Sequence, residues 1–148
     1  MNARKQYITM LRNSRPSELC QEKTVSAIRR ELMEWILLRR YDLPDDDLGV
    51  MSTRLDIPKE DFARYISVCL GTRYSSMRKR LRICDACELL VSNPDEPLSS
   101  IGRRVGITDK RNFRKEFAQE VGTYPSDWRM MHCRRPGLLT VTEPQETD

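Results

Sequence analysis

Hydrophobic residues recur along this chain at the spacing of amphipathic helices rather than of strands. Between residues 24 and 40 they return every three or four positions, with one step of one. This spacing predicts a helix with one buried stripe, made of Val25, Ile28, Leu32, Trp35 and Ile36. Thr24 is a candidate cap for its first turn. No segment shows sustained strand alternation, so we predict an all-α fold.

Helix-start and turn residues divide the rest of the chain. Acidic residues after Pro44 favour a helix start, because they complement the positive end of the helix dipole. Gly71 and Gly122 stand where helices commonly end in a left-handed residue. The predicted helices run from the acidic residues after Pro44 to about 55, and then from about 58 to 70, 74 to 92, 98 to 105, 109 to 121 and 125 to 131.

The pattern of residues 51–77 returns in residues 101–128. Matched positions before the turn lie 50 residues apart and those after it lie 51 apart, because the second turn is one residue longer. The matched pairs are Met51 and Ile101, Ser52 and Gly102, Leu55 and Val105, Asp56 and Gly106, Ile57 and Ile107, Phe62 and Phe113, Ile66 and Phe117, Leu70 and Val121, Gly71 and Gly122, and Met77 and Trp128. A duplicated helix-turn-helix predicts such a repeat.

The second copy has the four features that a helix-turn-helix needs. Gly102 is the small residue where the helices nearly touch, Gly106 tolerates a positive φ, and Ile107 fills the angle beside the turn. The second helix opens with the polar run 109–112, and Thr108 or Asp109 is its candidate cap. We therefore predict a DNA-reading helix here.

Cationic residues lie on the outward face of that helix or at its edge: Lys110, Arg111, Arg114 and Lys115. Arg and Lys donate to guanine edges, and Asn pairs with adenine. A charge run alone is more often a solvated surface, but inside this motif it favours DNA contact.

Charge is unevenly distributed along the chain. The net charge is +4, which by itself identifies no partner. Residues 41–71 contain three Lys/Arg against seven Asp/Glu, whereas residues 72–135 contain fourteen against eight. The first copy of the repeat is therefore acidic, and the second lies in a basic segment.

Residues 99–117 and 122–129 resemble the C-terminal signature of the AraC/XylS transcription regulators, and Arg82, Ala86, Leu89 and Leu90 match that family's linker helix. The resemblance covers about residues 24–132. It implies an all-α domain of about seven helices, in which two helix-turn-helix subdomains are joined by a long linker helix. Both recognition helices would enter the major groove on one side of the DNA, roughly 34 Å apart.

The resemblance carries DNA-contact positions onto both copies. Base contacts are implied for Glu60, Ala63 and Arg64 in the first copy and for Lys110, Arg111, Asn112 and Lys115 in the second. Lys59 and Arg114 complete the candidate set. Pro58 stands where the family usually has a capping serine, and the first recognition helix opens with the acidic run Lys59-Glu60-Asp61. The second recognition helix is therefore expected to be the main reader.

Together, pattern and resemblance predict five segments. These are a flexible N-terminal extension (1–20), a first helix-turn-helix subdomain (21–74), a linker helix (75–92), a second subdomain (93–132) and a disordered tail (133–148). Basic residues at the start of the linker helix, among them Arg73 and Arg78, are candidate phosphate contacts, whereas Arg82 matches a structural position of the family.

Other chemistry receives less support. Cys84 and Cys87 have a zinc-like spacing that His132 and Cys133 would complete. The same spacing places two small apolar side chains on one face of a helix, which we favour. His132 is the only histidine, and we identify no nucleotide-binding loop or paired-carboxylate site, so we expect no enzyme activity and no cofactor. A DNA-repair enzyme with a reactive cysteine remains a rival.

The expected protein is a sequence-specific DNA-binding transcription regulator. It would bind double-stranded DNA and activate transcription through RNA polymerase, without a small-molecule effector domain in this chain. The absence of an export signal and of a long apolar run favours the reducing cytoplasm, with no membrane partner. The alternative is a helix-turn-helix protein-interaction module with little sequence-specific DNA binding.

Overall fold

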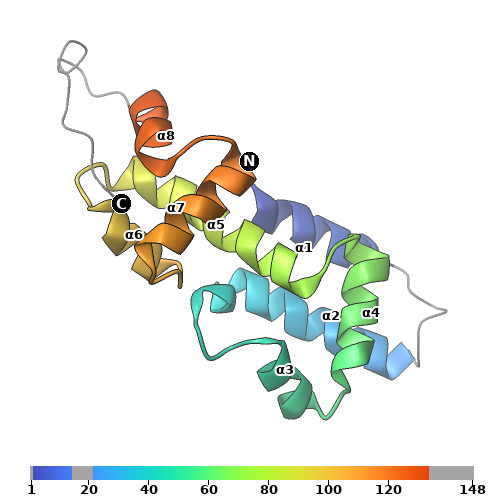
Figure 1. The fold of residues 1–148 in the computed structure, drawn as a ribbon. Coiled ribbons are helices and arrows are strands. Elements are labelled where there is room, and N and C mark those ends of the chain that lie inside the picture. The colour runs from blue at the N-terminus through green and yellow to red at the C-terminus, as the bar shows by residue number, and fades with distance from the viewer. Residues whose placement is uncertain (1, 15–21, 134–148) are drawn as a thin grey trace. The chain divides into compact units, whose positions relative to one another are not determined.

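The computed structural model describes residues 2–14 and 22–133. This part of the chain contains eight α-helices and one short 3-10 helix, with no strand (Figure 1). The all-α fold class predicted from the sequence is confirmed. The elements are α1 (Ala3–Asn13), α2 (Glu22–Leu37), η1 (Arg40–Asp42), α3 (Leu48–Leu55), α4 (Lys59–Leu70), α5 (Tyr74–Ser92), α6 (Leu98–Arg104), α7 (Lys110–Val121) and α8 (Pro125–His132). Among the described residues, no helix is long and apolar enough to cross a membrane.

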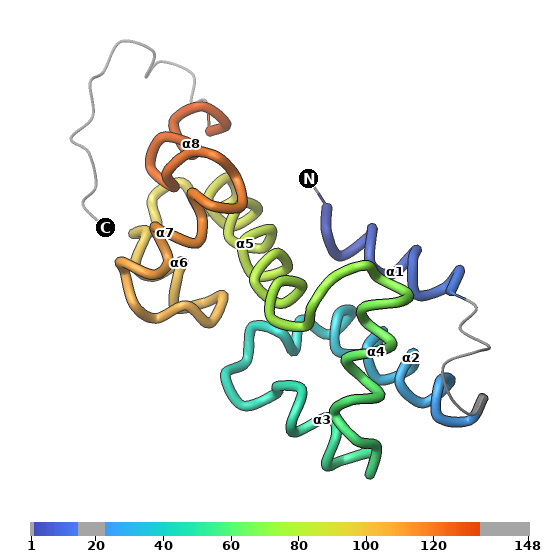
Figure 2. The backbone as a smooth tube through the Cα atoms, turned by 45° about the vertical axis from the view of Figure 1, so that its right-hand side comes forward, coloured from blue at the N-terminus to red at the C-terminus, as the bar shows by residue number. Residues whose placement is uncertain are grey.

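The chain divides into two compact units, Met1–Leu81 and Arg82–Asp148, and α5 runs across the boundary. Each unit contains one pair of helices joined by a tight turn, α3 with α4 in the first and α6 with α7 in the second (Figure 2). The finer predicted boundaries, with a separate linker at 75–92, stay a prediction.

Helix α1 corrects an expectation. A flexible extension is expected over residues 1–20, but residues 3–13 are helical, and Ala3, Tyr7, Ile8 and Leu11 are buried. Eleven residues are too few for a stable isolated helix in water, so α1 depends on its packing against α2 and α4. The Arg4 guanidinium extends this contact by donating to the Leu37 carbonyl at 3.1 Å. Residues 15–20 lie outside the described part.

The first unit packs around α2. Trp35 is fully buried, its ring meets Tyr41 edge-on at 5.6 Å between centroids, and its Nε1 donates to the Asp46 carbonyl at 2.9 Å. The predicted buried stripe is confirmed, but α2 begins at residue 22, so Thr24 lies inside the helix and does not cap it. The helix also ends at Leu37, three residues before its predicted end, and η1 follows.

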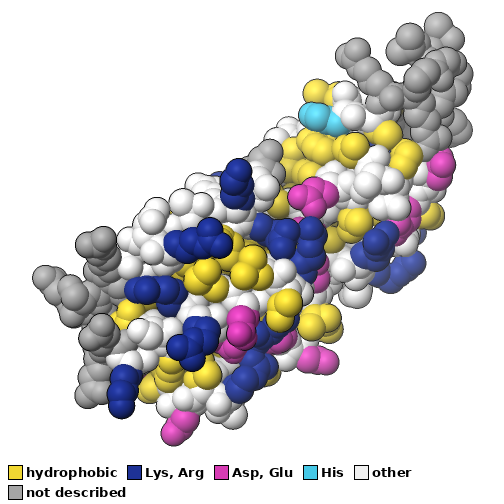
Figure 3. Space-filling view, turned by 180° about the vertical axis from the view of Figure 1, so that it is seen from behind, with side chains coloured by type: hydrophobic (Ala, Val, Ile, Leu, Met, Phe, Trp, Pro, Cys, Tyr) yellow, Lys and Arg dark blue, Asp and Glu magenta, His cyan; other side chains and the backbone are white. Residues whose placement is uncertain are grey.

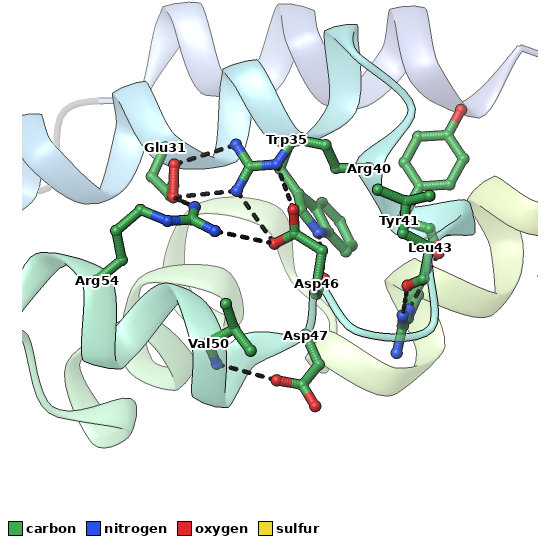
Figure 4. A network of polar contacts seen from close by, with 10 residues as sticks. Glu31, Trp35, Arg40, Tyr41, Leu43, Asp46, Asp47, Val50 and Arg54 are labelled. Carbon is green, nitrogen blue, oxygen red and sulfur yellow. Dashed lines mark hydrogen bonds and ion pairs between the residues drawn. The ribbon is translucent and has the colours of Figure 1, made fainter.

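A four-residue ionic network ties α2 to α3 (Figure 4). Glu31, only 6% exposed, accepts from Arg40 at 3.2 Å and from Arg54 at 2.6 Å. Arg40 also contacts Asp46 at 2.6 Å, and this hydrogen bond holds the pKa of Asp46 below its ordinary value. The acidic residues do mark a helix start, but they precede α3 rather than filling its first turn: Asp47 is the N-cap, and its carboxylate accepts from the Val50 backbone amide at 3.0 Å. Asp46, in contrast, belongs to the network.

The second unit has a core built from α5, α6 and α7. Its buried residues are Ile83, Ala86, Leu90, Leu98, Ile101, Val105, Ile107, Phe113 and Phe117, and Trp128 of α8 packs against them. Phe117 meets Phe113 at 6.0 Å and Trp128 at 6.1 Å between ring centroids, in edge-on geometry. The helices of this unit begin and end within one residue of their predicted bounds.

Candidate nucleic-acid interface

The second turn shows why the sequence places glycine at two of its positions. A Cβ atom on Gly102 would lie 2.9 Å from the Ile107 carbonyl oxygen and 3.1 Å from Cγ of Phe113. Helices α6 and α7 therefore approach too closely for a larger residue without a backbone shift. Gly106 has φ 86°, a left-handed conformation that glycine adopts without steric cost. The predicted small contact and turn residue are confirmed.

The first turn repeats these contacts with different side chains. The Ile57 amide donates to the Ser52 carbonyl at 3.1 Å, as the Ile107 amide donates to the Gly102 carbonyl at 2.8 Å. The Ser52 hydroxyl donates to the Ile57 carbonyl at 2.5 Å. Asp56 takes the left-handed conformation at φ 52°, which Asp tolerates better than most residues.

Helix α7 presents a polar face supported by an aromatic one. The Asp109 carboxylate accepts from the Asn112 amide at 2.9 Å, so Asp109 is the cap. Phe113 and Phe117 are buried on one side, and at 3.6 residues per turn Arg111 and Lys115 lie on the opposite side. All the candidate residues of this helix are exposed: Lys110, Arg111, Asn112, Arg114 and Lys115.

Helix α4 has the same construction but a different outward face. Phe62 and Ile66 are buried, and the candidate residues Lys59, Glu60, Ala63 and Arg64 are exposed. Pro58 occupies the N-cap without a side-chain hydrogen bond, as its replacement of a capping serine predicts. Val68 also lies on the outward side and is 61% exposed. Its spacing of four from Arg64 is the sequence signal that could have identified it.

Figure 3 shows the molecule from behind the view of Figure 1, and on that face Lys and Arg side chains lie among hydrophobic and acidic ones. The candidate interface is defined by the local helix-turn-helix geometry and by the exposed residues of α4 and α7.

Comparison with known proteins agrees with this geometry. A family model described as a helix-turn-helix domain matches residues 51–131, more than half of the chain. This chain belongs to the AraC-type helix-turn-helix family. The family comprises DNA-binding transcription regulators, so the chain is an AraC-type DNA-binding module. No curated protein matches it.

Two solved structures share the AraC-type fold. One is the C-terminal domain of AraT, a response regulator from Geobacillus stearothermophilus, with a TM-score of 0.67 and 22% identity over 78% of this chain and 93% of that one. The other is the C-terminal domain of the two-component response regulator yesN from Fusobacterium nucleatum, with a TM-score of 0.60 and 22% identity over 68% of this chain and 96% of that one.

The AraC-type repeat extends to polar contacts that sequence reasoning missed. Asp46 pairs with Arg54 at 3.6 Å, and Glu96, 50 residues after Asp46, pairs with Arg104 at 2.6 Å, 50 residues after Arg54. Both pairs join the segment before the first helix of a helix-turn-helix to the end of that helix. The sequence signal was the equal spacing of the two carboxylate–arginine pairs.

A second duplicated contact fastens the helix that follows each recognition helix. Arg78 on α5 donates to the Leu43 carbonyl, and Arg129 on α8, 51 residues later, donates to the Asn93 carbonyl at 3.4 Å, 50 residues after Leu43. Arg78 thus joins α5 to the segment before α3. Its phosphate contact stays a prediction. The structural role expected of Arg82 agrees with its bond to the Gly106 carbonyl at 3.3 Å.

The cysteine pair lies within helix α5, and Cys87 packs against the second core. Cys84 is buried, and burial raises the pKa of Cys87 to about 12. Such a thiol is protonated at neutral pH and is a poor nucleophile. His132 stacks on Trp128 at 4.1 Å between ring centroids. Within residues 2–14 and 22–133, no group of three or more His, Cys, Asp or Glu side chains is arranged to hold a metal.

Proposed function

We propose that this chain is a sequence-specific transcription regulator that reads the major groove mainly through α7. The observation that carries the proposal is that Arg111 and Lys115 are both exposed on α7, on the side opposite the buried Phe113 and Phe117. The B-DNA major groove, roughly 12 Å wide, admits an α-helix. Arg111, next to the helix start, would donate to N7 and O6 of a guanine, while Lys115 would reach one turn further.

The remaining polar residues of α7 suit the same approach. Asn112 is exposed, and its amide side chain can pair with adenine through N6 and N7. Lys110 lies at the first helical position, where the DNA backbone passes in helix-turn-helix complexes. The Asp109 carboxylate accepts a hydrogen bond from the Asn112 backbone N–H, so the start of α7 is already ordered in the free protein.

Helix α4 is proposed as the weaker reader. Glu60 takes the place that Arg111 has in α7, 51 residues later. A carboxylate is repelled by phosphates, although it accepts a hydrogen bond from cytosine N4. Arg64, exposed one turn after Glu60, supplies the main attraction in this unit, and Lys59 and Ala63 flank it.

We also propose that the bound protein activates transcription by contacting RNA polymerase, as the family more often activates than represses. Transcription in a purified system from a promoter carrying the selected site should increase with protein concentration. A decrease would identify a repressor instead.

Selected-site sequencing with random duplexes tests the proposed function. We expect an enriched motif that contains a guanine in the segment read by α7. Binding without an enriched motif, lost at moderate salt, would contradict sequence-specific reading, because phosphate contacts alone give salt-sensitive affinity without preference.

A protein-interaction module is the second candidate. The outward face of α4 favours it, because the hydrophobic Val68 is 61% exposed on a helix that opens with Glu60 and Asp61. If α4 docks on a protein, Val68→Asp should abolish that docking and leave DNA selection unchanged. A loss of selection in Val68→Asp, with the fold intact by circular dichroism, would assign α4 to DNA.

A further inference from the structure

Each recognition helix borders a shallow groove, and the two grooves occupy equivalent places in the repeat. The first is lined by Ser67, Gly71, Thr72, Arg73 and Ser76. The second is lined by Arg111, Arg114, Lys115, Ala118, Gln119 and Tyr124. Ser67 corresponds to Ala118 and Arg73 to Tyr124, each 51 residues apart. The same wall of the groove therefore carries a cation in the first unit and an aromatic ring in the second.

The opposite position shows the reverse exchange. Ala63 in α4 corresponds to Arg114 in α7, again 51 residues later. The guanidinium carbon of Arg114 lies 4.2 Å from the centroid of the Tyr124 ring. The arginine of the first groove, Arg73, thus comes from the turn after the recognition helix, whereas the arginines of the second groove, Arg111 and Arg114, come from the recognition helix itself.

The stack on Tyr124 determines how Arg114 presents its hydrogen-bond donors. A guanidinium that covers an aromatic ring keeps its in-plane N–H groups directed outward at its rim. Such a fork matches two oxygens of one phosphate. Tyr124 makes no side-chain cap bond to α8 and is 44% exposed, and its ring stacks with the Arg114 guanidinium.

The position of Arg114 on α7 favours the DNA backbone over the bases. It lies on the flank of the helix, one residue from the buried Phe113, whereas Arg111 and Lys115 lie opposite the buried side. Flanking residues of a helix in the major groove lie beside the groove walls, where the phosphates are. In the first groove, hydroxyl-bearing residues surround Arg73, and hydroxyls also donate to phosphate oxygens.

We propose that Arg114, positioned by Tyr124, binds a DNA phosphate and replaces in the second unit the contact that Arg73 makes in the first. This rests on the proposed DNA binding and names a residue pair for it. Tyr124 is the positioning residue. The proposed phosphate-contacting cation is Arg73, in the turn after the recognition helix, in the first unit, and Arg114, on the recognition helix, in the second.

Moving the arginine from position 114 to position 124 tests this proposal directly. Affinity is measured against salt concentration for Arg114→Ala and for the double variant Arg114→Ala/Tyr124→Arg, which restores the first unit's arrangement. Arg114→Ala should weaken binding to selected and scrambled duplexes by the same factor and lower the log–log salt slope by about 1. The double variant should recover both. Tyr124→Phe, which keeps the ring, should behave as the original protein, and Tyr124→Ala should lie between.

Gln119→Ala is the matched control, because it removes an uncharged side chain from the same groove and should leave the slope unchanged. The proposal is overturned if Arg114→Ala leaves the slope unchanged, if the double variant stays as weak as Arg114→Ala, or if the loss is confined to one base position. Enrichment of a motif together with an unchanged slope in Arg114→Ala would leave the proposed function standing without this contact. A lowered slope in Arg114→Ala without any enriched motif would support the phosphate contact and contradict sequence-specific reading.

Discussion

The two helix-turn-helix units share their internal contacts and differ on their outward faces. The close approach of the helices, the left-handed turn residue, a carboxylate–arginine pair and an arginine bond to a backbone carbonyl all recur at spacings of 50 or 51 residues. On the recognition helices, however, Glu60 corresponds to Arg111 and Ala63 to Arg114. Contacts that hold the helices at their angle restrict the residue types at inward positions. The residue types at outward positions are restricted instead by the partner that they bind.

The polar supports of the two units differ in depth. In the first unit the pair of Asp46 and Arg54 joins the buried Glu31 and Arg40 in one network. In the second, Glu96 pairs with Arg104, which is 49% exposed. The duplicated pair itself is about equally exposed, with Arg54 at 45% and Arg104 at 49%. The first support should nevertheless matter more, because Glu31 and Arg40 extend it into the interior, where water screens an ion pair less.

The largest expected effect separates these two supports. Glu31→Ala leaves Arg40 and Arg54 with one carboxylate between them, and we expect a loss of about 3 kcal/mol in the free energy of unfolding, the lower end for a broken buried pair. Glu96→Ala should cost about 1 kcal/mol. Urea unfolding of both variants measures the difference, and equal losses would contradict the contrast.

Close helix approach should distinguish the turns next. Gly102→Val places a branched side chain against a carbonyl oxygen and the Phe113 ring, and we expect about 1–3 kcal/mol of destabilisation from overpacking. The counterpart Ser52→Ala removes one hydrogen bond and should cost about 1 kcal/mol. If Gly102→Val unfolds at the same urea concentration as the original protein, the approach of α6 and α7 is looser than the distances indicate.

Acidification should have a smaller effect, and it should destabilise both units. Hydrogen bonds from Arg40 and from the Ser100 hydroxyl, respectively, are the leading causes that lower the pKa values of Asp46 and Glu96. Because the folded-state values lie below the unfolded ones, this stabilisation is complete above about pH 5 and is lost as the pH falls through the folded-state values. Asp46→Asn should therefore be less stable than the original at pH 7, and the difference should shrink as the pH falls through the folded-state pKa of Asp46. A difference that does not change with pH would show that the charge is not responsible.

Much of the fold could be predicted because its determinants are local. Gly71 and Gly122 end their helices, Asp109 begins one, and the buried positions follow a helical period. Helix α1 was missed because its short apolar stripe is stabilised by packing against α2 and α4 rather than by local signals. The ionic network was missed for the same reason, since it joins residues from 31 to 54 through tertiary structure.

The candidate interface, too, could be predicted from the sequence only where local spacing determines it. Periodicity alone places Arg111 and Lys115 opposite the buried Phe113, and the structure has them exposed there. The stack of Arg114 on Tyr124 joins residues ten positions apart across the end of α7, and no helical period relates them. Base contacts themselves stay a prediction, because they depend on a partner as well as on the chain.

The contrast between the outward faces is tested most directly by measuring the affinity of Glu60→Ala and Arg111→Ala for one duplex that carries the selected site. Arg111→Ala should lose about 1–3 kcal/mol of specific binding and relax the preference at one position. Glu60→Ala, for which we expect the smallest change, should bind as tightly as the original protein or more tightly, since it removes a carboxylate that phosphates repel. A larger loss in Glu60→Ala than in Arg111→Ala would contradict the account and make the acidic unit the principal reader.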